Sequence, residues 1–208
     1  MHDYSQLLLK RWREILAFGV VAAAFGVGIS LFFPLKYSAT MRLLIIQKQL
    51  AQSDPYTAIK ASEGIADNLG QIIYTTSFFD KVSTAKEYKI DWSVLPTDER
   101  KKRKAWAKTV DTQVVRGSGL LQVAVYHKNK DQAVEIARDI AYTLTTEGWQ
   151  YVGGGDLQVK LVDDPLISRF PVKPNVPVNA VTGFVLGLIA GAGYVMITRK
   201  KEMFGVHV

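Results

Sequence analysis

The hydrophobic residues of this chain are distributed in two ways, as long uncharged runs near both ends and as short periodic stripes between them. Residues 15–33 carry no charge, and a second apolar run covers residues 180–197. About 19 residues at roughly 1.5 Å per residue span about 28 Å, close to the thickness of a bilayer's hydrocarbon core. We therefore predict two transmembrane helices, at residues 15–33 and 180–197.

Residues 34–170, between the two runs, show the patterns of a folded domain. Alternating polar and apolar positions predict strands at residues 37–45, 109–115, 120–126 and 157–161. Apolar positions predict helices at residues 56–76, 77–86 and 129–149, and residues 97–108 are predicted as a polar helix. The order β-α-α-α-β-β-α-β indicates an α+β domain in which helices cover one face of a mixed sheet.

Residues with special backbone preferences mark where these elements begin and end. Asp54 can cap the first helix of the domain, with Pro55 at its first position, and Thr97 is expected to start the third. The three glycines at 153–155 are expected to end the last helix, and the Asp-Asp-Pro sequence at 163–165 to form a turn after the last strand.

The last helix of the domain, at residues 129–149, has the strongest amphipathic pattern. Its apolar stripe is predicted to face the sheet, and a polar side carries Lys130, Glu135, Arg138 and Asp139.

The second apolar run contains Gly183, Gly187 and Gly191, which recur every fourth residue. This spacing places them on one helix face and allows another helix to approach closely. The alternative is an ordinary membrane anchor, because membrane helices tolerate glycine in general. Before this run, Pro171, Pro174 and Pro177 predict a stiff, extended spacer over residues 171–179.

Basic residues flank both apolar runs on their outer sides, within residues 1–14 and 198–208. The positive-inside tendency therefore puts both termini in the cytoplasm and the domain outside. A cleaved signal peptide is disfavoured because the first run is long and ends in bulky residues. The inverted topology is the less favoured alternative.

The net charge of +7 is shared between the flanks and the domain, and within the domain five basic residues are consecutive. The preferred interpretation of this run is a solvated helix face, and the second is a contact for anionic headgroups or a phosphorylated glycan. The run consists of Arg100, Lys101, Lys102, Arg103 and Lys104. Nucleic acid comes last, because no aromatic residues are interleaved for stacking.

The sequence offers little for a catalytic site. His2, His127 and His207 are isolated, the chain has no cysteine, and the three glycines at 153–155 lack the Lys-Ser or Lys-Thr of a phosphate-binding loop. Ser118 has no nucleophile-elbow pattern around it. We expect no catalytic residue, no metal and no cofactor, and therefore no enzyme activity.

The chain resembles the polysaccharide co-polymerases, the Wzz-type chain-length determinant proteins of bacterial surface-glycan assembly. The resemblance rests on the basic-flanked first span, the strand at 37–45, and the sequence at 171–177 ahead of the three spaced glycines. Two departures are the short domain, which lacks the long helical arm of many members, and the absence of a nucleotide-binding loop or tyrosine cluster after Lys201.

This resemblance implies a non-enzymatic homo-oligomeric ring in the bacterial cytoplasmic membrane, which controls the length of an O-antigen, capsule or exopolysaccharide together with a polymerase or exporter. The helices at 54–76 and 129–149 would lie at subunit contacts and the three glycines at membrane contacts. One alternative is an adaptor whose tail, with an apolar patch at 203–206, docks a separate tyrosine kinase. Another is a sensor or scaffold that binds a ligand outside the cell.

Overall fold

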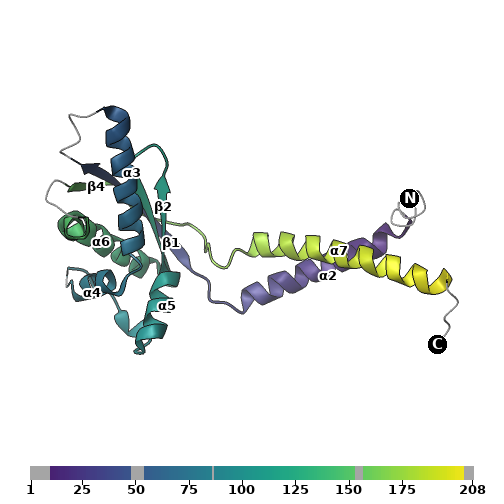
Figure 1. Ribbon diagram of the computed structural model, residues 1–208. Coiled ribbons are helices and arrows are strands. Elements are labelled where there is room, and N and C mark those ends of the chain that lie inside the picture. Colours follow the sequence, from purple (N-terminus) through teal and green to yellow (C-terminus); the bar gives the residue numbers. More distant parts are fainter. Residues whose placement is uncertain (1–9, 48–53, 86, 153–156, 204–208) are drawn as a thin grey trace. The chain divides into compact units, whose positions relative to one another are not determined.

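The computed structural model describes residues 10–47, 54–85, 87–152 and 157–203 (Figure 1). They form two compact units, an α+β domain of residues 36–172 and a pair of helices from the segments before and after it. The elements in chain order are α2 (Trp12–Leu31), β1 (Tyr37–Gln47), α3 (Pro55–Ile72), α4 (Thr76–Thr84), η2 (Trp92–Val94), α5 (Glu99–Thr109), β2 (Val110–Val115), β3 (Leu120–His127), α6 (Lys130–Glu147), η3 (Gly148–Tyr151), β4 (Leu157–Ile167) and α7 (Val176–Met203).

The four strands form one sheet in the order β2-β3-β1-β4, and every neighbouring pair is antiparallel. The α+β class is confirmed, but the expected mixed sheet is wrong. Strands β3 and β4, which precede and follow α6 in the sequence, run in the same direction. In the sheet, however, β1 lies between them and is antiparallel to both. Because no two parallel strands are neighbours, the sheet has no parallel pairing.

The core lies on one face of this sheet, as the alternation along β1 predicts. Ala39, Met41, Leu43 and Ile45 are at most 1% exposed, whereas Arg42 points to solvent. Their buried side chains form one cluster with residues of all four domain helices, and Figure 1 shows α3 and α6 on the same side of the sheet. The opposite face of the sheet has no helix over it within the described part of the domain.

The helix starts follow local capping chemistry. The side chain of Asp54 accepts a hydrogen bond from the Thr57 amide at 3.3 Å, with Pro55 in the first turn, which confirms the predicted cap. Helix α5 begins later than expected. Its cap is Asp98, whose carboxylate accepts from the Lys101 amide at 2.9 Å, rather than Thr97.

Strand β4 is longer than predicted and contains the sequence Asp163-Asp164-Pro165, so the expected turn there is wrong. Two physical facts permit proline in this strand. Strand β4 is at the edge of the sheet, where an amide hydrogen is dispensable. Its register against β1 also shifts on both sides of Arg42, which marks a bulge or irregularity next to the proline.

Helix α7 begins at Val176, so Pro177 lies in its first turn and only residues 171–175 remain for the proline spacer. The cap explains this early start. The side chain of Asn175 accepts a hydrogen bond from the Val178 amide at 3.3 Å. A proline in the first helical turn costs nothing, because amides there lack helical partners.

The glycines at 153–155, which were expected to end the last domain helix, lie outside the described residues. Helix α6 itself ends at Glu147, and the 3₁₀ turn η3 follows it directly.

Candidate functional surfaces

The three glycines of α7 make close contacts with α2 of the same chain. A Cβ added at Gly187 would lie 2.5 Å from the Phe18 carbonyl oxygen, and one added at Gly183 would lie 2.6 Å from that of Ala22. At Gly191 the nearest atom, at 3.0 Å, is the Cα of Ile15. The close approach expected from the spacing is therefore made to another helix of the same chain.

Helix α2 contributes small residues of its own to this contact. A Cβ at Gly26 would lie 2.8 Å from the Asn179 carbonyl oxygen, and one at Gly19 would meet Leu188 and Phe184 at 2.9 Å. Sequence reasoning missed both glycines. The available signal was their seven-residue spacing, which places them on the same face of α2, two turns apart.

A polar pair also joins the two helices. Asn179 of α7 donates a hydrogen bond from Nδ2 to the hydroxyl of Ser30 at 2.8 Å. That hydroxyl in turn donates to the Gly26 carbonyl at 2.9 Å, and Ser30 is fully buried. The arrangement fixes the position of one helix along the other, because a shift of one turn would separate both partners.

The outward sides of both helices are apolar and exposed. Val21 and Phe25 of α2 and Val181 and Ile189 of α7 are each more than 60% exposed. Both helices are long and apolar enough to cross a membrane, over Trp12–Leu31 and Val176–Thr198. Exposed apolar side chains on such helices suit contact with lipid tails.

The basic run on α5 is divided between two roles. Lys102 forms an ion pair with Glu99 at 3.2 Å and places its ammonium 5.3 Å from the centre of the Phe79 ring. Arg103 donates from Nε to the Thr76 hydroxyl at 2.9 Å. Both therefore help to hold α5 against α4. Arg100, Lys101 and Lys104 are exposed, and Arg103 is exposed as well although it makes this hydrogen bond.

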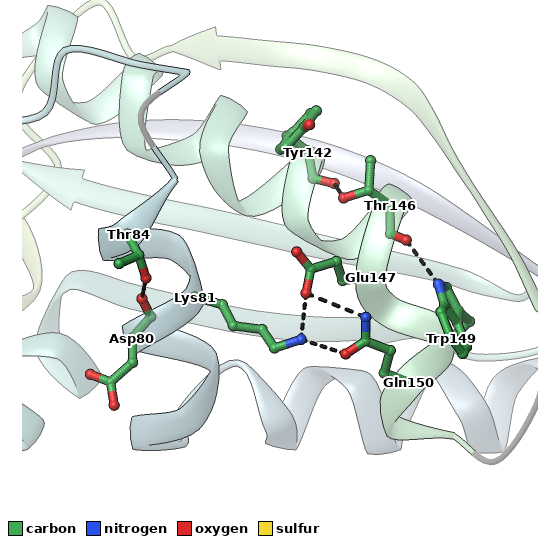
Figure 2. Close-up of polar contacts among 8 residues, drawn as sticks. All are labelled: Asp80, Lys81, Thr84, Tyr142, Thr146, Glu147, Trp149 and Gln150. Carbon is green, nitrogen blue, oxygen red and sulfur yellow. Dashed lines mark hydrogen bonds and ion pairs between the residues drawn. The ribbon is translucent and has the colours of Figure 1, made fainter.

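A second polar cluster ties α4 to the end of α6 (Figure 2). The Lys81 ammonium contacts the Glu147 carboxylate and donates to the Gln150 side-chain oxygen at 2.6 Å. The same ammonium lies 5.3 Å from the centre of the Tyr151 ring. These contacts are partly exposed and bring no nucleophile or proton donor into a cavity, so we assign the cluster to stability.

The most unusual buried group is the carboxyl of Asp139 on α6. It was expected on the polar side of the helix, but it is fully buried and neither oxygen has a hydrogen-bond partner. Residues 87–91 lie over this side of α6, since Gln132 hydrogen-bonds the Lys89 carbonyl and the Asp91 amide. Burial, with a smaller contribution from the Glu87 charge, raises the pKa of Asp139 to about 7.

The other candidates from the sequence have structural roles or lie outside the described residues. His127 accepts a hydrogen bond at Nδ1 from the Asn129 amide at 3.1 Å, whereas His2 and His207 are not described. Ser118 donates to the Val115 carbonyl within the β2–β3 turn. In the part of the chain that the structure covers, no three His, Cys, Asp or Glu side chains group as metal ligands would.

The face of the sheet without helices forms an open depression along β1 and β4. Arg42 lies at its centre and reaches Asp163 at 3.5 Å and the Gln122 side chain at 3.4 Å. Leu166 projects beside it and is 77% exposed. These are weak, solvent-exposed contacts, so the depression lacks the enclosed polar groups of a small-molecule site.

The described features thus define a class, an α+β domain placed between two apolar helices that pack on each other. Comparison with protein-family models and with curated proteins found no match to this chain.

Proposed function

We propose that this chain is a membrane protein of bacterial surface-polysaccharide assembly, which regulates how long a glycan polymer grows without performing chemistry itself. The observation that carries the proposal is the α2–α7 pair. One apolar helix precedes the domain in the sequence and the other follows it, and glycine contacts and a buried polar pair hold the two helices together. Such a unit can position an outside domain at a membrane. The resemblance to the polysaccharide co-polymerases supports the same role.

In this proposal both termini are cytoplasmic and the domain lies outside the cytoplasmic membrane. The chain has no cysteine, so a single introduced thiol reports its own side of the membrane. Arg116→Cys places that thiol in the exposed β2–β3 turn. We expect a membrane-impermeant maleimide to label it in intact spheroplasts. Labelling only after lysis would reverse the proposed topology.

The proposed homo-oligomer requires contact surfaces other than the glycine face, because α2 occupies that face. The domain helices offer exposed apolar side chains for this purpose: Tyr56 and Ile59 on α3 and Tyr142 on α6, which are 70%, 43% and 40% exposed. Burying them between neighbouring copies would gain apolar contact area.

Glycan length tests the function directly. We expect loss of the gene to change the length distribution of the surface polysaccharide on a gel, and the wild-type gene to restore it. Ile59→Glu with Tyr142→Glu should reduce the particle mass of the purified protein and fail to restore glycan length. Val94→Glu, at an exposed position on η2, is the matched control and should restore it. An unchanged length distribution in the deletion strain would exclude the proposed function.

A further inference from the structure

Both connections between the domain and the apolar helices leave from the same end of the sheet. The Val172 amide donates to the Lys36 carbonyl at 2.8 Å, and the Ser168 amide to the Ser38 carbonyl at the same distance. One row of paired residues, Val110, Val125, Ala39 and Ile167, crosses all four strands near this end. We call the residues beyond that row the tether end: 36–38, 108–109, 126–131 and 168–172.

The tether end is strongly cationic. It holds a single carboxylate, that of Asp131, and five cations: Lys36, Lys108, Lys128, Lys130 and Arg169. The opposite end of the sheet differs. Its described residues beyond the row Val115–Leu120–Leu44–Lys160 include Arg116 and Asp54, and the neighbouring α3 side chains Lys60 and Glu63 pair with each other at 3.1 Å, so this end is balanced in charge. The excess positive charge is therefore concentrated where the chain enters and leaves the domain.

Two of these cations are held in place beside aromatic rings. The Lys130 ammonium lies 4.6 Å from the centre of the Tyr37 ring, at the first residue of β1. The Arg169 guanidinium carbon lies 5.6 Å from the centre of the Phe170 ring, and Phe170 is 69% exposed. A cation next to an exposed aromatic side chain suits the boundary between headgroups and acyl chains, where aromatic residues are enriched.

We propose that the tether end is a docking surface for anionic phospholipid headgroups. The inference rests on the proposed membrane insertion of α2 and α7, because two adjacent connections to a membrane-spanning pair keep this end near the bilayer surface. A negatively charged surface attracts nearby Lys and Arg side chains, and each gives about a fivefold gain in binding within a Debye length. Lys108, Lys128, Lys130 and Arg169 all have exposed side chains.

The sequence offered another possible anionic contact, the basic run of α5, as the alternative to a solvated helix face. Lys102 and Arg103 of that run hold α5 against α4. Its other three members, Arg100, Lys101 and Lys104, are exposed and provide a matched comparison, because reversing their charges changes the net charge as much as reversing those of Lys128, Lys130 and Arg169.

The test uses the full-length chain in lipid nanodiscs of phosphatidylcholine, with or without roughly one third phosphatidylglycerol. Amide hydrogen exchange is measured at residues 127–131, 168–170 and 172. We expect exchange about tenfold slower in the anionic discs, and loss of this difference at high salt. The triple variant Lys128→Glu, Lys130→Glu, Arg169→Glu should lose the difference, whereas Arg100→Glu, Lys101→Glu, Lys104→Glu should keep it.

The same three positions changed to Gln remove charge without reversing it and should reduce the lipid dependence while the core amides of β1 and β3 stay protected. Equal exchange in neutral and anionic discs would overturn the proposal, as would loss of the difference in the α5 variant alone. Failure of the wild-type chain to insert both helices, seen by protease accessibility, would instead refute the membrane proposal and this one with it. Glycan length is measured separately and can fail independently.

Discussion

In the domain, large side chains fill the space between helices and sheet, whereas in the α2–α7 pair glycines bring two backbones into contact. Trp106, Phe78 and Met41 are at most 1% exposed in the domain core, while a Cβ at Gly187 would lie within 2.7 Å of three atoms of α2. In water, a fold gains from burying large apolar groups. Between helices surrounded by lipid that gain is absent, so close packing and hydrogen bonds become the main source of stability.

The two regions also treat their buried polar groups differently. In the helix pair, the Ser30 hydroxyl both donates and accepts a hydrogen bond. In the domain, the Asp139 carboxyl is buried without any partner. The helix pair thus uses a polar contact to fix its geometry, whereas the domain tolerates a polar group that weakens it.

The largest effect should follow removal of Trp106, which would break the domain and leave the helix pair intact. Trp106→Ala creates a cavity and leaves the Ile73 carbonyl without its 2.7 Å hydrogen bond, so we expect a loss of about 4 kcal/mol in unfolding free energy. Denaturant unfolding followed by circular dichroism measures it.

A second readout separates the two units. Cysteines introduced at Phe18 and Tyr194, whose rings lie 5.3 Å apart, should still be joined by a short cross-linker in Trp106→Ala. Loss of this cross-link would show that the helix pair depends on the domain core. Trp106→Phe is the milder control, because it keeps most of the side-chain volume and chiefly removes the hydrogen bond to the Ile73 carbonyl.

The reverse experiment breaks the helix pair. Gly187→Leu forces a side chain against the Phe18 carbonyl and Ala22, and we expect a loss of about 3 kcal/mol together with loss of the 18–194 cross-link. Gly193→Leu is the matched control, since a Cβ there meets nothing within 4 Å. Equal cross-linking in the two variants would contradict the close approach of the helices at Gly187.

Asp139 makes the stability of the domain dependent on pH. Its folded pKa of about 7 lies above the ordinary value near 3.8, so the folded state binds the extra proton and stability falls as pH rises from about 4 to 7. Asp139→Asn should raise the unfolding free energy by about 2 kcal/mol at pH 8 and change it little at pH 4. Melting temperatures at both pH values test this.

Asp164→Asn, at an exposed carboxylate on β4, provides the control and should show no such pH-dependent gain. If Asp139→Asn destabilised the domain equally at both pH values, the carboxyl would have to have a partner.

The smallest effect concerns the polar pair of the helices. Asn179→Leu should cost about 1 kcal/mol, because hydrogen bonds between membrane helices contribute modestly. Adding Ser30→Ala should cost little more, since the first change has already removed the shared bond. Full additivity, measured as the cross-linked fraction in denaturant, would show that the two side chains act separately.

Features that depend on neighbouring residues could be predicted from the sequence, whereas the pairing of strands far apart in the sequence could not. The Asp54 cap, the strand alternation of β1 and the stripe of α6 depend on neighbouring residues, and all were predicted. The antiparallel order around β1 depends on partners far along the chain.

The same limit applies to the candidate surfaces. Glycine spacing showed that a helix would approach α7, but not which helix. Asp139 lies next to Arg138 on an amphipathic helix, and only the covering residues 87–91 reveal that it is buried. The tether end gathers cations from four separate segments, so no run in the sequence marks it.

The central position of β1 has a consequence for how the protein is made. Of the four strands, β1 is synthesised first. Leu43 of β1 pairs with Leu121 of β3, which is 78 residues further along the chain, and Val159 of β4 is made later still. At roughly 5–20 residues per second, β1 waits about 4 to 16 s for its first partner. During synthesis the central strand of the sheet is thus unpaired, and α7 is made only after all four strands.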